Sequence, residues 1–244
     1  MRIITRNASL DRDKVSGFYA ARPGAAPKPG VLFIHHANGV TAEIREYAER
    51  LARLDYGAFA VNMFHALGAK GESPMGHGRQ MQEKHKDAEF LKAITDGWNY
   101  LVAQPGVDRK RTAAIGYCMG GRLAIPFAAD HPEIRAIVLN YPSIRDEPPS
   151  EFKPRMGYDT VLELKCATLL ICGGRDAVSP PAMQQRVLNG LIANGQPLEY
   201  HFYHDAAHGF LSMEGEYHHA DVAHRIWPIT TDFLERYVAE PAAA

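Results

Sequence analysis

The segment 114–121, Ala-Ile-Gly-Tyr-Cys-Met-Gly-Gly, constrains the fold of this chain more than any other part of it. The apolar residues before the cysteine are typical of a buried strand, and the residues after it have the apolar spacing of a helix. Where a strand turns directly into a helix, backbone and side chains crowd, and Gly116 and Gly120 supply the small residues needed there. The segment therefore predicts a sharp strand–turn–helix unit with Cys118 at the turn.

A cysteine at such a turn has two interpretations. A Gly-x-Cys-x-Gly turn between a strand and a helix is typical of a site that exposes a nucleophile. The alternative is a buried, inert cysteine that packs as a small apolar residue. Because strand, turn and helix follow one another without a gap, we expect Cys118 to be a nucleophile.

Strand-like and helix-like segments alternate along the rest of the chain. The predicted strands cover residues 15–21, 31–35, 58–64, 112–117, 136–141, 167–172 and 198–203. The predicted helices are one that begins at residue 41 and those at 81–102, 121–129, 181–193 and 217–238, with loops at 22–30, 68–78 and 142–157. This alternation predicts an α/β fold with a mostly parallel central sheet and helices on both faces.

The length and charge of the chain limit the kind of partner. At 244 residues the chain is long enough for an α/β domain, and we expect one domain over residues 1–244. Its formal net charge is −1 and it has no run of five Lys or Arg residues, which does not fit binding to nucleic acid or to an anionic membrane. A small molecule is therefore the expected partner, and the oligomeric state is left open.

The N-terminal residues and the cysteines indicate the compartment. The N-terminus lacks the apolar stretch of a secretion signal, and no segment approaches the apolar length of a membrane-spanning helix. The chain has 3 cysteines, an odd number that argues against a disulfide framework and fits a reducing compartment. We expect a cytoplasmic protein in which Cys166 and Cys172 are buried packing residues of a strand.

Polar residues gather where predicted strands end, which is where open α/β sheets carry their functional groups. Cys118, Asp176 and His208 each follow a predicted strand, in the order nucleophile, acid and histidine. A thiol with a pKa of about 8.5 is little ionised at neutral pH, so it needs a neighbouring imidazole. We expect His208 to take the thiol proton and Asp176 to hold the imidazole in the correct tautomer. The backbone N–H groups of Met119 and Ala37 are the expected oxyanion hole.

Each of the two partner residues also has an ordinary explanation. Taken singly, Asp176 fits a turn or a helix cap, and His208 fits a surface or packing histidine. Their order behind the cysteine turn is what favours the catalytic interpretation.

Three motifs together resemble those of the dienelactone hydrolase family: Gly-Tyr-Cys-Met-Gly-Gly, Gly-Gly-Arg-Asp and His-Gly-Phe. The resemblance extends over nearly the whole chain. It implies an α/β-hydrolase fold in which Cys118 is the nucleophile, Asp176 orients the histidine and His208 is the base. It also implies hydrolysis of ester bonds, which are those of cyclic enol-lactones in the best-known members, without a cofactor.

The chain departs from the pattern of that family at two places. Where dienelactone hydrolases carry a glutamate that interacts with the resting cysteine, this chain has His36. Where they place Ser and Arg after the catalytic histidine to hold a substrate carboxylate, this chain has Gly-Phe-Leu-Ser at 209–212. Arg79 resembles another substrate-binding arginine of the family, and an ordinary solvated arginine is the alternative.

The position of His36 beside Ala37 indicates a role in the site. We expect His36 either to polarise the substrate carbonyl or to act as an alternative partner of the Cys118 thiol. A strand-end histidine that hydrogen-bonds nearby backbone is the other explanation.

The 12 histidines raise the question of a metal site. Neighbours along a strand point to opposite faces, so His35 and His36, or His201 and His204, do not converge on one ion. The chain also lacks the His-Glu-x-x-His and paired Cys-x-x-Cys spacings. We therefore expect neither a metal nor a cofactor.

These observations favour a hydrolase that cleaves an ester or lactone bond of a small molecule through a covalent acyl-enzyme on Cys118. A general carboxylesterase or thioesterase without a preference for lactones is the first alternative. The second is a hydrolase fold that has lost activity and binds a ligand. A chain with nucleophile, acid, base and oxyanion loop in order does not favour this second alternative.

Overall fold

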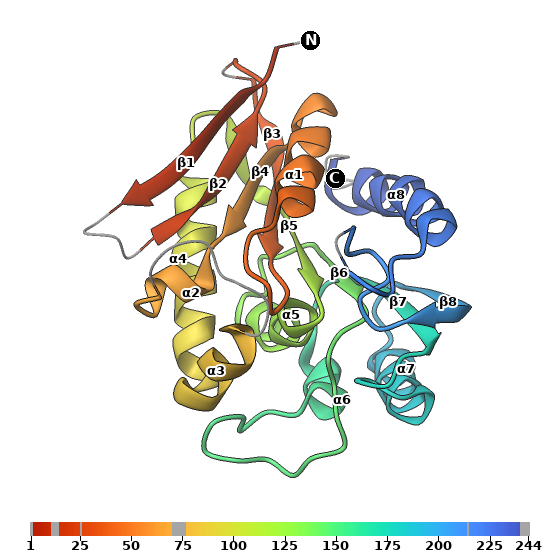
Figure 1. The fold of residues 1–244 in the computed structure, drawn as a ribbon. Coiled ribbons are helices and arrows are strands. Elements are labelled where there is room, and N and C mark those ends of the chain that lie inside the picture. Colours follow the sequence, from red (N-terminus) through yellow and green to blue (C-terminus); the bar gives the residue numbers. More distant parts are fainter. Residues whose placement is uncertain (1, 11–14, 25, 70–76, 214, 240–244) are drawn as a thin grey trace.

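The computed structural model describes residues 2–10, 15–24, 26–69, 77–213 and 215–239, and within them eight strands form one sheet (Figure 1). The strands are β1 (Ile4–Leu10), β2 (Val15–Ala21), β3 (Lys28–Ile34), β4 (Gly57–Val61), β5 (Val107–Tyr117), β6 (Ala136–Asn140), β7 (Ala167–Arg175) and β8 (Leu198–Ala207). They lie in the order β1-β2-β4-β3-β5-β6-β7-β8. β2 pairs antiparallel with β1 and β4, and all other neighbouring strands pair parallel.

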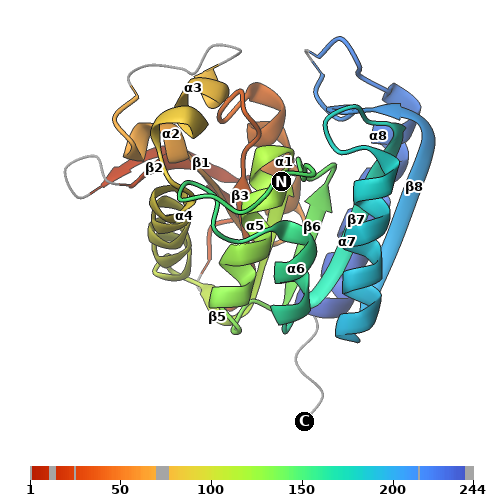
Figure 2. The ribbon, with the colours of Figure 1, turned by 90° about the horizontal axis from the view of Figure 1, so that it is seen from below.

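Helices cover both faces of the sheet. In chain order they are α1 (Ala42–Arg53), α2 (Met63–Ala66), α3 (His77–Lys84), α4 (Asp87–Val102), α5 (Met119–Asp130), α6 (Gly157–Thr160), α7 (Pro181–Asn194) and α8 (Ala220–Leu234). A 3-10 turn, Val161–Glu163, follows α6, and a π-helical turn, Glu235–Ala239, follows α8. Figure 2 shows α1 and α8 on one face of the sheet and α4, α5 and α7 on the other. The predicted α/β arrangement is therefore confirmed.

Burial on both faces explains why the central strands are almost wholly apolar. Every residue of β3, β4 and β6 is buried, as parallel strands between two layers of helices must be. Side chains alternate across β3, so that Val31 and Phe33 belong to the apolar cluster under α1 and α8. Leu32 and Ile34 belong to the cluster under α4 and α5. The two clusters pack against opposite faces of the sheet. Polar side chains that could form a site therefore lie at the edge where the strands end.

The predicted helix 81–102 is two helices, so its predicted boundaries are wrong. A break separates α3 from α4, because Lys86 is extended, with φ −75° and ψ 152°. The Lys86 N–H donates to the Glu89 side chain at 2.9 Å, which caps the start of α4. Apolar periodicity alone does not locate such a break. Most of the predicted loop 68–78 lies outside the described residues.

Strand boundaries differ from the sequence prediction at most strands: β3 and β5 begin earlier than predicted, at Lys28 and Val107, and β6 ends one residue earlier, at Asn140. The sequence pattern does not reveal β1, an edge strand whose described side chains are mostly exposed. The strand expected at 58–64 is shorter, because Asn62 caps α2 by accepting the His65 N–H at 3.1 Å. β7 and β8 run further than expected and end directly before Asp176 and His208. The longer strands therefore carry these two side chains to one edge of the sheet.

Candidate active site

Cys118 lies in the strained turn that joins β5 to α5. Its backbone has φ 52° and ψ −115°, an unusual conformation for a residue with a side chain. A Cβ at Gly120 would lie 2.1 Å from the Ile34 carbonyl oxygen, and a Cβ at Gly116 would lie 2.4 Å from the Gly120 oxygen, so both glycines are required. The Cys118 N–H donates to the Asn140 carbonyl at 3.0 Å. The turn therefore holds a partly buried thiol at the point where β5 ends.

Three side chains from three strand ends meet at this turn. His208 Nε2 lies 2.9 Å from Cys118 Sγ, and His208 Nδ1 lies 2.8 Å from Asp176 Oδ2. The other carboxylate oxygen of Asp176 accepts the Val178 and Ser179 N–H groups, both at 2.8 Å. Asp176 is only 2% exposed, so these bonds fix its orientation. The structure thus brings within hydrogen-bonding distance the three residues that chain order singled out.

The surroundings of His208 favour its protonated form. Burial lowers the pKa of this imidazole, but hydrogen bonds to Asp176 and Cys118 and the negative charges of both outweigh burial and raise the pKa to about 9. The Tyr141 ring packs T-shaped against the imidazole, with 5.3 Å between the ring centroids. An imidazolium beside the sulfur is suited to hold a thiolate.

The other two cysteines have apolar surroundings. Cys166 and Cys172 are buried and form no disulfide, as predicted. Burial raises the pKa of both thiols, that of Cys166 to about 12. Thiols of this kind are inert, which leaves Cys118 as the candidate nucleophile among the cysteines.

The two expected oxyanion donors border the same cavity as the thiol. Met119 is the first residue of α5, where a backbone N–H has no partner within the helix. Ala37 lies in the loop after β3, and its carbonyl accepts the Gly78 N–H at 3.1 Å. Both residues line a cavity of about 430 Å³ together with Cys118 and His208. This placement fits donors to the oxyanion that forms on a carbonyl oxygen when the sulfur bonds to the carbonyl carbon.

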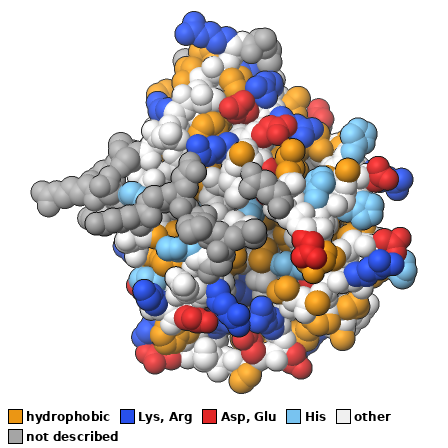
Figure 3. All heavy atoms as spheres, viewed as in Figure 1, with side chains coloured by type: hydrophobic (Ala, Val, Ile, Leu, Met, Phe, Trp, Pro, Cys, Tyr) orange, Lys and Arg blue, Asp and Glu red, His pale blue; other side chains and the backbone are white. Residues whose placement is uncertain are grey.

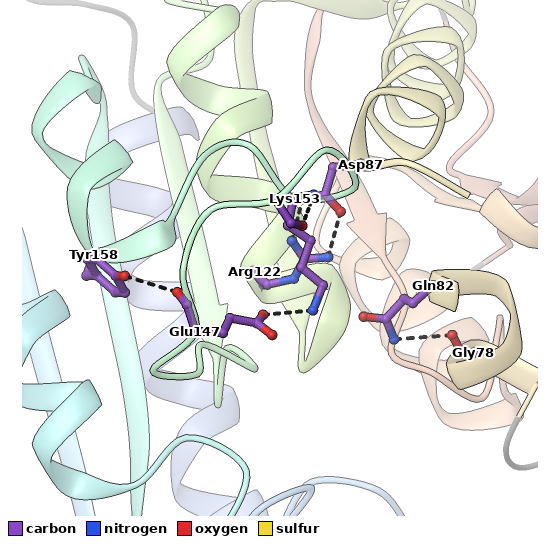
Figure 4. A network of polar contacts seen from close by, with 8 residues as sticks. Gly78, Gln82, Asp87, Arg122, Glu147, Lys153 and Tyr158 are labelled. Atoms are coloured by element: carbon purple, nitrogen blue, oxygen red, sulfur yellow. Dashed lines mark hydrogen bonds and ion pairs between the residues drawn. The ribbon is translucent and has the colours of Figure 1, made fainter. Parts of the chain in front are cut away.

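Cationic side chains contribute to one wall of this cavity, and Figure 3 shows Lys and Arg side chains gathered in the lower part of that view. Arg122 of α5 is tied to Asp87 by two bonds of 2.6 and 2.8 Å, and Lys153 lies 2.7 Å from Glu147 (Figure 4). Arg145 is exposed, and no ion pair with another described residue is found for it. Glu83 and Glu147 line the cavity as well, so its charge is mixed, and Arg145 is the cationic side chain left to meet an anionic group.

Sequence patterns do not reveal Arg145 and Lys153. Both lie in the Pro-rich stretch between β6 and α6, where no periodicity relates a residue to the site. Arg79, the arginine singled out from sequence, also lines the cavity, but its side chain is 84% exposed and lies 3.5 Å from Glu83. The cavity thus has cationic side chains although residues 209–212 supply none.

A second cavity, of about 340 Å³, borders the thiol as well. His36, Tyr141 and Tyr217 contribute to its walls. Cys118 and His208 line both cavities, so a bound ester has room on either side of the reacting carbonyl.

His36 has protein partners at both ring nitrogens. Its Nδ1 accepts the Asn38 N–H at 3.2 Å, so Nε2 carries a hydrogen and faces Glu43 Oε1 at 3.2 Å. The second oxygen of Glu43 accepts the Met213 N–H at 2.9 Å. Burial raises the pKa of Glu43, but the hydrogen bonds from His36 and from the Met213 N–H hold it below its usual value. Sequence patterns do not point to Glu43, and the predicted roles of His36 toward substrate or thiol stay predictions.

Within the described residues, no three His, Cys, Asp or Glu side chains lie close enough together to hold a metal ion. In the same part of the chain, no helix combines the length and the apolar character needed to cross a membrane. That the protein needs neither metal nor cofactor stays a prediction.

The fold and the position of the thiol define the class of this protein. A mostly parallel sheet flanked by helices, with a strained turn after a central strand, is the arrangement of α/β-hydrolase enzymes. Residues 16–238 match the sequence profile of the dienelactone hydrolase family, and the chain belongs to this family of hydrolases. The family and the enzyme class predicted from the sequence motifs are confirmed.

Relatives and solved structures agree with this assignment. A protein of Yersinia pestis, provisionally named carboxymethylenebutenolidase, is 27% identical over 223 residues, which are 90% of this chain and 83% of the relative. The crystal structure of a provisionally named dienelactone hydrolase from Klebsiella pneumoniae has a TM-score of 0.87 at 23% identity and covers 97% of this chain and 100% of its own. A dienelactone hydrolase-like promiscuous phosphotriesterase from metagenomic libraries has a TM-score of 0.80 at 19% identity and covers 96% and 98%. At these identities the two structures support the fold.

Proposed function

We propose that this protein hydrolyses an ester or lactone bond of a small molecule, with Cys118 as the nucleophile and a covalent acyl-enzyme as the intermediate. One observation carries the proposal: Cys118 Sγ lies 2.9 Å from His208 Nε2, and His208 Nδ1 lies 2.8 Å from Asp176 Oδ2. A thiol, a base within hydrogen-bonding reach and a buried carboxylate that orients the base are the parts of a nucleophilic acyl-transfer site.

In the acylation half of the reaction, the Cys118 thiolate attacks the ester carbonyl carbon, and the carbonyl π electrons move to the oxygen. The resulting oxyanion accepts hydrogen bonds from the Ala37 and Met119 N–H groups, which border the same cavity. When the tetrahedral intermediate collapses, the ester carbon–oxygen bond breaks and the His208 imidazolium gives its Nε2 proton to the leaving oxygen. A thioester on Cys118 and a hydroxyl group result.

In the deacylation half, neutral His208 takes a proton from a water molecule, and the water oxygen attacks the thioester carbonyl carbon. The carbon–sulfur bond then breaks, which releases the carboxylic acid and restores the thiolate beside the imidazolium. Asp176 accepts the Nδ1 hydrogen of His208 throughout, so that Nε2 always faces the sulfur.

Two observations support a substrate that carries an acidic group. Arg145, for which no ion pair with another described residue is found, borders the cavity beside the thiol and attracts an anion such as a carboxylate on the acyl part of the substrate. The name of the Yersinia pestis relative refers to a butenolide that bears a carboxymethylene group. Because the two cavities also have room for linear esters, a general carboxylesterase or thioesterase is the alternative.

Turnover by purified variants tests the proposal. Wild-type protein should hydrolyse a carboxylated five-membered enol-lactone or a short activated ester, and Cys118→Ala should lose at least about 10³-fold in kcat/KM. Cys166→Ala is the matched control: it removes a buried thiol outside the site and should leave kcat/KM within about twofold.

Mass spectrometry supplies an independent readout of the intermediate. His208→Gln, which lacks the base for deacylation, should gain the mass of one acyl group from an activated ester, whereas Cys118→Ala should gain none. Hydrolysis that survives in Cys118→Ala contradicts a thiol nucleophile. A wild-type protein that turns over no lactone, ester or thioester favours the inactive binding protein instead.

A further inference from the structure

We infer that His35 is a positioning residue for the oxyanion hole: it fixes the peptide group between His36 and Ala37 and so aims the Ala37 N–H at the reacting carbonyl oxygen. The inference rests on the proposed function, because an oxyanion hole is needed only if Cys118 forms a tetrahedral intermediate. The sequence raises His35 only as a candidate metal ligand, and the catalytic steps above do not use it.

The contacts of His35 determine its tautomer. The side chain directly follows β3 and is completely buried. Its Nε2 lies 3.1 Å from the Met63 backbone nitrogen, which only donates, so Nε2 is the acceptor and carries no hydrogen. Its Nδ1 therefore carries the hydrogen and donates to the His36 carbonyl oxygen at 2.7 Å. The Phe64 ring packs T-shaped on the imidazole, with 4.6 Å between centroids, and fixes the plane of the ring.

The hydrogen bond from His35 Nδ1 to the His36 carbonyl also sets the direction of the Ala37 N–H, because both groups belong to one rigid peptide. The His36 carbonyl and the Ala37 N–H belong to one planar trans peptide group, in which C=O and N–H point in opposite directions. Because His35 holds the carbonyl oxygen toward the interior, the Ala37 N–H points away from His35. Ala37 lines both cavities that contain Cys118, so this direction is the one a substrate oxygen would occupy.

Several neighbouring polar backbone groups of this loop have partners inside the protein. The Gly39 N–H also donates to the His36 carbonyl at 3.1 Å, and the Gly78 N–H donates to the Ala37 carbonyl at 3.1 Å. The Asn38 N–H donates to His36 Nδ1 at 3.2 Å. No hydrogen bond from the Ala37 N–H to another described residue is found. The Ala37 N–H is therefore a donor that this loop leaves for a ligand, as a preorganised oxyanion hole requires.

The charge state of His35 fits this role. Complete burial lowers its pKa to about 3, so the imidazole is neutral wherever a thiolate enzyme works. A protonated ring would carry a hydrogen on Nε2 and lose the acceptor for the Met63 N–H. Neutral His35 thus holds α2 on one side and the oxyanion loop on the other.

Loss of the hydrogen bond from His35 to the His36 carbonyl should raise the energy of the acyl-transfer transition state and leave the reactivity of the thiol unchanged. Ester hydrolysis builds negative charge on the carbonyl oxygen, which the Ala37 N–H stabilises. Alkylation of the same thiol by iodoacetamide displaces iodide at a saturated carbon and builds no oxyanion. The two reactions of Cys118 therefore separate the oxyanion hole from the triad.

Two variants of His35 test the inference. His35→Leu removes both nitrogens, and we expect kcat for an ester to fall about 10- to 10³-fold with KM changed less than about threefold. His35→Asn places an amide N–H where Nδ1 stood, and we expect kcat within about fivefold of wild type. Both variants should keep the wild-type rate of alkylation by iodoacetamide within about twofold. The matched control is His131→Leu, at the far end of α5, which should change neither reaction.

Circular dichroism and thermal unfolding establish that each variant is folded. A folded His35→Leu with wild-type kcat overturns the inference, and so does a parallel loss of kcat and alkylation rate, which reports a damaged triad. If His35→Leu does not fold, His35→Asn decides: a loss of kcat beyond about tenfold contradicts positioning through the Nδ1 donor. A wild-type protein whose hydrolysis does not depend on Cys118 contradicts the proposed function, and the inference with it.

Discussion

Two histidines close to the thiol have opposite preferences for charge. Burial lowers the pKa of both His35 and His208. For His208, the bonds and charges of Asp176 and Cys118 more than offset burial, and its pKa is raised to about 9. His35 has only a backbone N–H and a backbone carbonyl as partners, and its pKa is lowered to about 3. Charge on the neighbouring groups is therefore what distinguishes His208, the proposed base, from His35, the proposed positioning residue.

The raised pKa of His208 predicts an alkaline limit that depends on the leaving group. Below pH about 9 the imidazolium holds the proton that an alkoxide leaving group needs, and above it the proton is lost. The kcat/KM for an unactivated alkyl ester should therefore fall as pH rises through about 9. A p-nitrophenyl ester, whose phenolate leaves without a proton, and alkylation by iodoacetamide should show no such fall. The pH dependence of kcat/KM for each ester and of the alkylation rate, measured from pH 6 to 10.5, tests this difference between substrates.

Asp176→Asn supplies the control for this pH dependence. It removes the negative charge that raises the pKa of His208, so the alkaline limit for the alkyl ester should move to lower pH. Alkyl ester, activated ester and alkylation that all fall together above pH 9 would show that His208 is not the proton donor to the leaving group.

Cys118, Asp176 and His208 could be predicted because each follows a strand and their chain order is diagnostic. Glu43 could not: it lies on α1, and only the packing of that helix beside the loop after β3 brings its carboxylate 3.2 Å from His36 Nε2. Patterns along one segment carry no information on contacts between segments of this kind.

The segment between β6 and α6 contributes two of the cationic side chains that line the cavity beside the thiol. It is anchored away from the thiol, because the Asp87 N–H donates to the Phe152 carbonyl at 2.8 Å and Lys86 contacts Glu151. Arg145 and Lys153 come from this segment and border the cavity, and Figure 4 shows Lys153 beside Glu147. A loop anchored in this way is suited to determine substrate specificity, because its residues can vary without any change in the sheet that carries the triad.

Arg145 provides a test of substrate charge. Arg145→Ala should lower kcat/KM for an ester that bears a carboxylate by about fivefold, because an exposed charge pair is worth about 1 kcal/mol or less. The neutral methyl ester of the same acyl group should be unaffected, and high salt should weaken the difference. Arg155→Ala is the matched control, since Arg155 pairs with Asp130 and Glu163 and does not line the cavity. Equal losses on both substrates would contradict a role in charge recognition.

Helices and strands could be predicted where one face is apolar, and their ends could not. The break between α3 and α4 depends on the extended backbone of Lys86 and on the side chain of Glu89, which apolar periodicity does not register. β1 is an edge strand with mostly exposed residues, so it has little apolar signal. The α3–α4 break and β1 escape prediction for the same reason. Apolar patterns indicate which residues are buried, and burial marks neither feature.

Across the whole sheet, the alternation of segments predicts parallel strands but not their order. β3 lies between β4 and β5, and β2 reaches β4 rather than β3. Such neighbours are set by pairing over long separations in the chain, which one sequence does not reveal. This order places the ends of β3 and β5 side by side, so the loop with Ala37 and the turn with Cys118 border one cavity.

The stability of the whole molecule should report the charge state of His35. Between about pH 3 and 6.5 the unfolded chain protonates this imidazole and the folded protein does not. The unfolded state then binds more protons, so the free energy of unfolding falls as pH falls through this window, by up to about 1.4 kcal/mol per pH unit. His35→Asn has no such group, and its free energy of unfolding should lack this contribution.

Urea unfolding of wild type and His35→Asn at pH 7.5 and 5 measures the effect. Other titrating groups are common to both proteins and cancel in the difference between them. The stability of wild type relative to the variant should decrease by about 2 kcal/mol between these pH values, because the folded pKa of about 3 lies well below the window. A difference that stays constant would mean that folded His35 is readily protonated. Its Nε2 would then carry a hydrogen and could not accept the Met63 N–H, which contradicts the assignment of Nε2 as acceptor on which the orientation of His35 rests.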